Sequence, residues 1–334
     1  MRLSELGEFG FIDSIRSVIG QPPERVLVGI GDDTAVIDIP GPMVLLVGTD
    51  AMVEGRHFEM DWIGPEEIGR RAASACMSDI AAMGGRLICL FATVGYPVDW
   101  SAEDARQVVK GMNDAAAHFE SGLAGGDTTS TEDGLFVDVV AIGEAERDQV
   151  WLRDGARPGD LVFVTGTLGD SAGTLAMIAE QYPRARGEFP TLFEALLSPV
   201  PRLKEASALT GADAVTACID ISDGLLQDAG HIASSSEVGI ELLAADLPIG
   251  DQLRDCGEAL GADPLLWAAA GGEDFELLLT VTEDKSSHIL DSAEKTATAL
   301  TQIGRVRDGE GVTLLDENGN TVEIFDGGWD HFRR

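Results

Sequence analysis

The chain has 334 residues, 44% of them hydrophobic, which is enough for two domains with apolar cores. Its 58 acidic residues outnumber its 23 basic residues, and the formal net charge at pH 7 is −35. Such a surface repels the phosphate backbone of nucleic acids and anionic membranes, so we expect neither as a partner. Lysine is scarce and no GxxxxGK[ST] motif occurs, so any binding of nucleotide phosphates must depend on metal ions and arginine.

We expect no targeting signal at the start of the chain. The first residues, MRLSELGEFG, lack the apolar stretch of a signal peptide, and no segment reaches about 18 uninterrupted apolar residues. The four cysteines form no CxxC pair, and we expect them to be reduced core residues. These features predict a cytoplasmic protein without a membrane-spanning segment.

The first half of the chain mixes apolar strands with amphipathic helices. A helix is predicted over 64–85, because Pro65 suits a first turn and Gly84 with Gly85 suits an end. A second helix is predicted over 101–120. Short apolar runs predict strands at 43–50, 87–97 and 135–145.

A charged, turn-rich segment at 146–160 divides the chain, and we expect domains at 1–148 and 149–334. The stretch 183–200 is expected to consist of turns. The order of elements lacks the repeated βαβ rhythm of a doubly wound sheet, so two α+β domains fit better. In the second half, helices are predicted at 170–181 and 223–236, and strands at 161–166, 214–222, 239–249, 275–281 and 311–319.

Aspartates recur at strand ends and in glycine-rich turns, flanked by small or apolar residues instead of basic ones. Mg²⁺ prefers oxygen ligands and shares its coordination shell among carboxylates, water and substrate phosphates. The recurrence of this pattern in both halves predicts a carboxylate cage for magnesium. The aspartates are Asp32 and Asp33 in GIGDD, Asp50 in GTD, Asp79 in MSDIAAMGG, Asp127 in AGGDTT, and Asp220 and Asp223 in IDISDG.

Each of these aspartates also has a structural explanation. The SDG motif suits a helix cap, and GGDTT suits a turn. Asp79 is harder to explain in this way, since a carboxylate late in a helix opposes the helix dipole. The metal-binding interpretation therefore depends on the whole set of sites and not on any single one.

Nine stretches of the sequence, spread over almost the whole chain, together resemble one enzyme family. They are GEFGFI (7–12), GIGDDTA (29–35), GTDAMVEGRHF (48–58), MSDIAAMGG (77–85), GGDTT (125–129), RPGDLVFVTGTLGDSAGTLAM (157–177), CIDISDGL (218–225), GGEDFEL (271–277) and GGWDHF (327–332). In this order they resemble thiamine-monophosphate kinases, members of the aminoimidazole-ribonucleotide-synthetase-like group of ATP enzymes.

The resemblance implies two α+β domains of the aminoimidazole-ribonucleotide-synthetase-like type, α/β-sandwich-like in build. It implies a homodimer that pairs the N-terminal domains, with ATP held near that interface. The implied reaction moves the γ-phosphoryl group of ATP directly onto the phosphate of thiamine monophosphate, giving thiamine diphosphate and ADP in the final step of thiamine diphosphate biosynthesis. Several Mg²⁺ ions are implied, and no catalytic general base, because the acceptor phosphate is already deprotonated at neutral pH.

The resemblance also assigns site residues. The implied Mg²⁺ ligands are Asp33, Gly48, Thr49, Asp50, Asp79, Asp127, Asp220 and Asp223. The implied ATP contacts are Gly126, Asp127, Arg153 and Ser222. The implied contacts of thiamine monophosphate are His57, Glu273 and Trp329. Asp274 remains an alternative to Glu273, and Asp32 is left with a role in stabilising the turn or in supporting a metal ligand. The family usually has serine at the position of Gly48, so here a carbonyl oxygen or a water would replace the hydroxyl.

Two other classes of protein remain open at this point. One is a related synthetase that activates an amide or a selenide through a phosphate intermediate. The selenide reaction would need a reactive cysteine or selenocysteine with a lysine near the N-terminus, and residues 1–28 contain neither. The other is a non-catalytic maturation or scaffold protein, which would not need an aspartate at every metal position.

Overall fold

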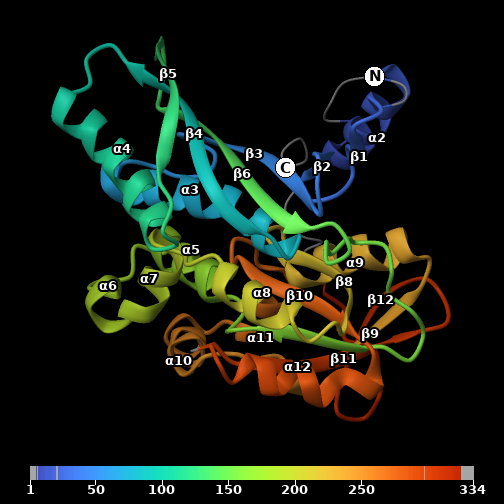
Figure 1. The fold of residues 1–334 in the computed structure, drawn as a ribbon. Helices are drawn as coiled ribbons and strands as arrows, with labels where there is room; N and C mark the ends of the chain where they lie inside the picture. The colour runs from blue at the N-terminus through green and yellow to red at the C-terminus, as the bar shows by residue number, and fades with distance from the viewer. Residues whose placement is uncertain (1–4, 6, 20–21, 297, 325–334) are drawn as a thin grey trace.

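The strands of the protein form two six-stranded sheets, one in each half of the chain (Figure 1). This computed structural model describes residues 5, 7–19, 22–296 and 298–324. The implied substrate contact Trp329, with the GGWDHF motif, lies outside the described residues. The two α+β halves agree with the predicted fold class.

The first sheet has the order β1-β2-β3-β6-β4-β5 and is antiparallel except for the parallel pair β4–β5. The strands predicted at 43–50, 87–97 and 135–145 are confirmed. GGDTT, considered above as a turn, instead lies within the edge strand β5, whose polar, exposed residues give no apolar alternation. The strands are β1 (Val26–Val28), β2 (Ala35–Asp38), β3 (Met43–Val53), β4 (Arg86–Pro97), β5 (Leu123–Thr131) and β6 (Phe136–Glu146).

The second sheet has the order β12-β9-β11-β7-β10-β8 and is antiparallel except for the parallel pair β12–β9. Its central strands β7 and β10 are buried along their whole length, which explains their continuous apolar runs. Strand β11 was not predicted. The strands are β7 (Leu161–Thr165), β8 (Val215–Ile221), β9 (Gly239–Leu243), β10 (Glu276–Val281), β11 (Leu300–Arg307) and β12 (Gly311–Leu315).

The four helices predicted from the sequence are confirmed, and the prediction for one further segment is wrong. The stretch 183–200 was expected to consist of turns, but it contains the short helices α6 and α7. Helix α7 starts at Pro190 and buries an apolar face that repeats with helical spacing. The helices are α2 (Glu8–Ile19), α3 (Pro65–Ala82), α4 (Ala102–Ala117), α5 (Asp170–Ala179), α6 (Ala185–Glu188), α7 (Pro190–Leu197), α8 (Leu203–Thr210), α9 (Leu225–Ser236), α10 (Asp251–Leu260), α11 (Pro264–Ala270) and α12 (Ser286–Ala293), with 3₁₀ turns η1 (Ala244–Asp246) and η2 (Glu283–Lys285).

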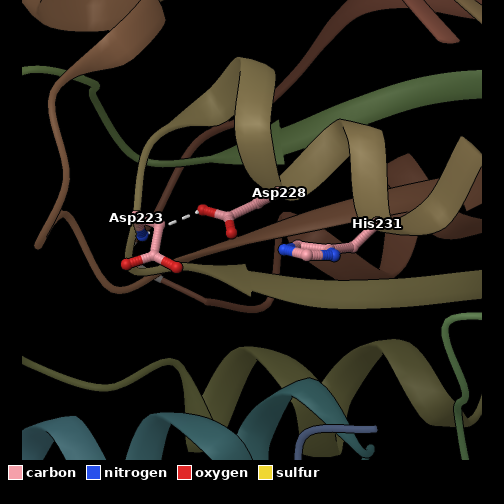
Figure 2. Close-up of side chains that lie close together, drawn as sticks. All are labelled: Asp223, Asp228 and His231. Atoms are coloured by element: carbon pink, nitrogen blue, oxygen red, sulfur yellow. Dashed lines mark hydrogen bonds between the residues drawn. The ribbon is translucent and has the colours of Figure 1, made fainter. Parts of the chain in front are cut away.

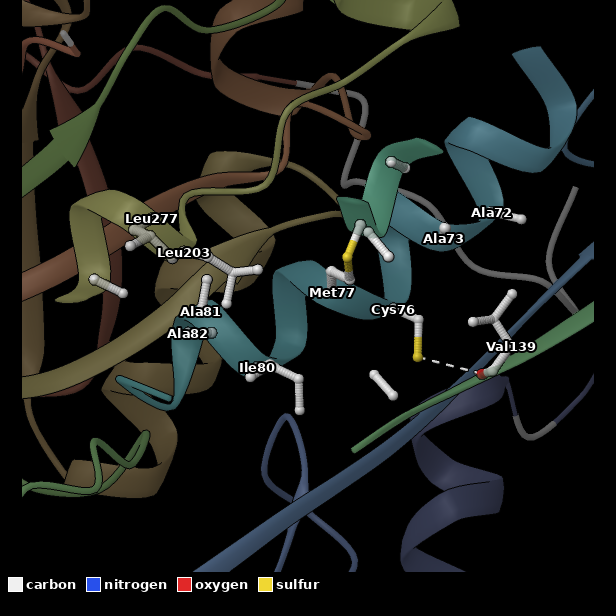
Figure 3. Packing of buried hydrophobic residues seen from close by; sticks show 14 of the residues in the cluster. Ala72, Ala73, Cys76, Met77, Ile80, Ala81, Ala82, Val139, Leu203 and Leu277 are labelled. Atoms are coloured by element: carbon white, nitrogen blue, oxygen red, sulfur yellow. Dashed lines mark hydrogen bonds between the residues drawn. The ribbon is translucent and has the colours of Figure 1, made fainter. Parts of the chain in front are cut away.

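Helix α3 packs between the first sheet and the second half of the chain (Figure 1). It is buried on several faces because most of its side chains are small or apolar. In Figure 3, Cys76 lies beside Val139 of β6, and its Sγ–H donates to the Val139 carbonyl at 3.2 Å. Farther along the helix, Ala81 lies close to Leu203 and Leu277 of the second half. The helix therefore carries Asp79 to the boundary between the two halves.

Two smaller predictions can also be compared with the structure. Cys76, Cys218 and Cys256 are buried free thiols, as predicted, whereas Cys89 is only half-buried. Within the described part of the chain, no helix is both long enough and apolar enough to cross a membrane.

Candidate functional site

A pocket of about 520 Å³ opens between the two halves of the chain. One wall is the end of β3 with the turn that follows it, residues 49–59. The facing wall is built from the end of β8 and the loop 272–275. Helix α3 contributes Arg71, Ala75 and Asp79, which share one face of the helix at a spacing of four residues. The site thus draws on segments that are far apart in the sequence.

Most of the predicted site residues line this pocket, and the other ones that the structure describes lie around it or on β5. The lining residues are Thr49, Asp50, His57, Asp79, Asp220, Ser222, Asp223 and Glu273. Five predicted residues are not part of the lining: Asp33, Gly48, Gly126, Asp127 and Arg153. The roles of all these residues remain predictions.

Three carboxylates from distant segments meet at the pocket. One oxygen of each of Asp33, Asp79 and Asp220 lies within 4.8 Å of the others, a spacing that a metal ion could bridge. Asp33 comes from the turn between β1 and β2, Asp79 from α3, and Asp220 from β8. The carboxylate oxygens suit a hard cation such as Mg²⁺.

The pKa values of these carboxyl groups reflect their crowding. Burial raises the pKa of Asp79 well above its usual range, and the charges of Asp220, Asp33 and Asp50 raise it further. Burial, with the charge of Asp33, raises the pKa of Asp220 to about 7. The pKa of Asp33 is also raised by burial, although Arg153 opposes that shift. Without a cation the cluster therefore retains protons that isolated carboxyl groups would lose.

Arg153 supplies one positive charge to this cluster. Its Nη2 donates to Asp33 Oδ1, and its backbone amide donates to Asp32 Oδ2 at 3.3 Å. Asp32 also accepts the amide of Asp33 at 3.0 Å, which agrees with its predicted turn-stabilising role. The other oxygen of the Asp33 carboxylate, Oδ2, is buried and has no hydrogen-bond partner among the described residues. Asp33 therefore keeps a ligand atom available beside the arginine.

Gly48, on β3, lies next to the Asp79 carboxylate of this cluster. A Cβ atom at this position would lie 3.2 Å from Asp79 Oδ2 and 3.3 Å from Thr34 Cγ2. A serine side chain here would therefore press against the Asp79 carboxylate. The Gly48 carbonyl, one of the two expected replacements for the serine hydroxyl, lies 3.7 Å from the Sγ of Cys76. The neighbouring Thr49 hydroxyl donates to Asp138 Oδ1 at 2.9 Å.

A second cluster, formed by Asp223, Asp228 and His231, lies at the start of α9 (Figure 2). Asp228 is buried, and its Oδ2 accepts three consecutive backbone amides, those of Ser222, Asp223 and Gly224, at 3.1, 3.1 and 3.0 Å. This single oxygen therefore fixes the turn that carries Ser222 and Asp223. We did not predict this role, although an acid in the first turn of a helix is the signal for it.

Gly126 and Asp127 occupy the exposed edge strand β5. The Asp127 carboxylate accepts the amide of Thr128 at 2.8 Å. A Cβ atom at Gly126 would collide with the backbone carbonyl of Ala92 on β4, so this position has room for glycine only. Glycine is therefore required here by the close approach of β4 and β5.

The turn after β3 holds His57 at the far end of the pocket. The amide of Val53 donates to His57 Nδ1 at 3.0 Å, which assigns the ring proton of a neutral imidazole to Nε2. Across the pocket, Arg71 on α3 bonds to Glu273 and lies over the ring of Trp62. Sequence reasoning missed Arg71 and Trp62, because nothing in a local pattern separates a buried arginine from an exposed one. Asp274, the alternative to Glu273, is half-buried and accepts the amide of Gly169 at 2.8 Å.

Two family models match the chain. The model described as AIR synthase related protein, N-terminal domain, matches residues 31–145, and the corresponding C-terminal domain model matches residues 157–317. The fold and the site thus define a two-domain protein of the AIR synthase related class.

Relatives that align with nearly the whole chain show which family within this class it belongs to. Thiamine-monophosphate kinase of Aquifex aeolicus (strain VF5) is 36% identical over 332 residues, which cover 99% of this chain and 100% of the relative. The enzyme of Bacillus subtilis (strain 168) is 35% identical over 309 residues, covering 92% and 94%. The chain belongs to the thiamine-monophosphate kinase family, as its motifs predicted.

Solved structures agree with this membership. The structure described as AaThiL complexed with AMPPCP and TMP matches with a TM-score of 0.86 and 35% identity, covering 99% of each chain. Hydrogenase maturation protein HypE in complex with ATP matches with a TM-score of 0.69 over 90% of this chain and 89% of its own. Its identity is only 20%, so this second similarity concerns the fold alone.

Proposed function

We propose that the protein transfers the γ-phosphoryl group of ATP to the phosphate of thiamine monophosphate, giving thiamine diphosphate and ADP. An oxygen of the acceptor phosphate forms a bond to the γ-phosphorus. The bond from that phosphorus to the oxygen bridging to the β-phosphate breaks, and ADP leaves with the bridging oxygen. The proposal is supported by full-length relatives named thiamine-monophosphate kinase and by the relative solved with AMPPCP and TMP.

The observation that carries this proposal is the meeting of Asp33, Asp79 and Asp220 at the pocket. Phosphate attacking phosphate is opposed by charge repulsion. Where a P-loop would offer lysine, the pocket offers Asp79 and Asp220, and the bonded pair of Asp33 and Arg153 lies beside them. Such carboxylates assist the reaction only if they hold cations between themselves and the phosphates. The unpartnered Asp33 Oδ2 and the all-oxygen donor set fit Mg²⁺.

In this proposal the three clustered aspartates would hold Mg²⁺, together with Thr49, Asp50 and Asp223 at the same pocket, Asp127 of β5, and the Gly48 carbonyl or a water in its place. The ions would supply positive charge against the triphosphate and the acceptor phosphate. The protein residues hold the two phosphates in line, and this positioning accounts for much of the rate. No side chain acts as a general base, because the acceptor phosphate carries no proton that must be removed.

The remaining predicted residues bind the organic parts and the phosphates. We assign Gly126, Asp127, Arg153 and Ser222 to ATP. Arg153 would exchange its bond with Asp33 for a nucleotide phosphate, which leaves both Asp33 oxygens to the metal. The organic part of the acceptor would contact Trp329, and also His57 and Glu273, both of which line the pocket.

We further propose a cytoplasmic homodimer of two-domain subunits, with domains at 1–148 and 149–334 and a contact through the N-terminal domains. The exposed edge strand β5 supports this contact, because its backbone groups on one side lack a neighbouring strand in the described chain. Gly126 and Asp127 lie on that edge, so a dimer would place the proposed ATP contacts beside the partner subunit.

A product assay tests the proposed reaction. Purified protein with ATP, Mg²⁺ and thiamine monophosphate should yield thiamine diphosphate and ADP in equal amounts, separated by chromatography. Asp50→Asn should reduce turnover at least about a hundredfold because it removes a metal ligand charge. Asp99→Asn, at an exposed position, is the matched control. Release of ADP and free phosphate without thiamine diphosphate would refute the proposal.

A further inference from the structure

Arg71 is a buried cation in the wall of the pocket, and no role has yet been given to it. It lies on α3, and its side chain is 1% exposed. Its guanidinium stands 5.5 Å from the centre of the Trp62 ring and bonds through Nη2 to Glu273 Oε1. Both of these partners also line the pocket.

Arg71 makes fewer hydrogen bonds than a buried arginine with a purely structural role would make. A guanidinium carries five N–H donors, and buried donors are normally satisfied. Among the described residues, neither Nε nor Nη1 of Arg71 has a hydrogen-bond partner, although both atoms are buried. Such a buried charge destabilises a fold relative to an apolar side chain of similar volume. Arg71 is therefore best explained by what it does to the pocket.

Glu273 is the group on which Arg71 acts. Its backbone is left-handed, with φ of 67°, and its amide donates to the Ser222 carbonyl at 2.7 Å. The preceding Gly272 lies against the same carbonyl, where a Cβ atom would collide. The backbone of Glu273 is thus fixed on the end of β8, and Arg71 fixes one carboxylate oxygen. The carboxylate remains 28% exposed, so its other oxygen, Oε2, can accept from a ligand.

The spacing along α3 relates this pair to the phosphoryl end of the pocket. Arg71, Ala75 and Asp79 line the pocket from one face of the helix. Eight residues of helix separate Arg71 from Asp79, a rise of about 12 Å. Between them, the small side chain of Ala75 leaves room for a ligand. An acceptor whose phosphate lies near Asp79 would therefore place a heteroaromatic ring about this far away, beside Arg71 and Glu273.

We propose that Arg71 is a positioning and specificity residue for the organic end of the acceptor substrate. It holds Glu273 so that the free carboxylate oxygen accepts a hydrogen bond from an amino group on a heteroaromatic ring, and Trp62 supports the guanidinium from behind by a cation–π contact. This inference rests on the proposed function, since it requires a phosphorylated acceptor with an amino-substituted ring.

Steady-state kinetics of three variants test this role. Arg71→Met keeps the side-chain volume and removes the charge. It should raise KM for thiamine monophosphate about tenfold or more, the loss expected when a charge-assisted hydrogen bond no longer holds its partner. KM for ATP and kcat should stay within about twofold of wild type, and the melting temperature should be unchanged or higher.

Arg71→Lys should recover part of the lost affinity. Arg70→Met is the matched control, because Arg70 is the next residue on α3 and bonds to Glu66 outside the pocket lining.

A double-mutant cycle separates positioning from a purely structural role. If Arg71 acts through Glu273, adding Arg71→Met to Glu273→Gln should cause little further rise in KM. An unchanged KM in Arg71→Met, or equal rises for both substrates with a lower melting temperature, would overturn the inference. If Arg71→Met does not fold, the same cycle is measured with Arg71→Lys and Glu273→Gln. Additive rises in KM in that cycle would overturn the inference. A wild-type protein that forms no thiamine diphosphate would overturn the proposed function first and this inference with it.

Discussion

Replacing Asp228 by alanine should destabilise the second half of the chain and loosen one wall of the pocket. Asp228 Oδ2 accepts the amides of Ser222, Asp223 and Gly224 at 3.1, 3.1 and 3.0 Å. The side chain is 2% exposed, so water cannot readily replace the lost acceptor. Alanine would leave three backbone donors without it.

The size of the effect follows from these three bonds. At about 1 kcal/mol net for each, their loss amounts to roughly 3 kcal/mol of unfolding free energy. Alanine also removes a carboxyl group whose pKa is raised by burial and by the charges of Asp223 and Asp220, and this offsets part of the loss. We therefore expect about 2–3 kcal/mol, or a fall in melting temperature of about 4–12 °C for a unit of this size.

Urea unfolding of the purified variants, followed by circular dichroism, measures this loss. Asp228→Asn is the matched control, because its carbonyl oxygen can accept the same amides, and it should lose no more than about 1 kcal/mol. Asp228→Ala should also weaken binding of a non-hydrolysable ATP analogue in calorimetry, since Ser222 and Asp223 lose their fixed turn. Wild-type stability in Asp228→Ala, or equal losses in the two variants, would refute the reasoning.

Two further perturbations test the buried charges. Burial raises the pKa of Asp220 from 3.8 to about 7 and that of Asp32 from 3.8 to about 6. The protonated carboxyl groups therefore stabilise the folded protein fully below about pH 4. This contribution to the free energy of unfolding is lost as the pH rises to about 7. The melting temperature of protein in EDTA should therefore fall between about pH 5 and about pH 8, and added Mg²⁺ should raise it more at the higher pH; equal effects of Mg²⁺ at both pH values would contradict this. Arg202→Ala should cost about 3–5 kcal/mol in urea unfolding, because Arg202 Nε donates at 2.6 Å to Glu276, whose side chain is 4% exposed, and the carboxylate would be left buried without its cation. Arg202→Lys should lose less, and a loss below about 1 kcal/mol in the alanine variant would show that the pair contributes little.

Local patterns were sufficient for eight of the twelve strands in the described chain, but for only four of its eleven α-helices. The strands at 43–50 and 135–145 were predicted from short apolar runs, and in the structure each buries alternate residues. The helix at 64–85 was predicted because proline and glycine mark its ends. Strand β5 was missed because its GGDTT segment is polar and exposed at a sheet edge, so no apolar alternation marks it. The short helices within 183–200 were missed because their apolar faces span only one or two turns.

The fold class, the family and the aspartates that suit metal binding could be predicted from the sequence, because strand ends and glycine turns can be recognised from neighbouring residues. The packing of the two halves was needed to show which of these groups meet, and which unpredicted residues join them. Arg71 bonds to Glu273 although 202 positions separate them, and Arg153 reaches Asp33 across 120 positions. The physical reason is that local patterns specify which face of a helix or strand is buried, whereas the partner of a buried charge is fixed only when the two halves pack together.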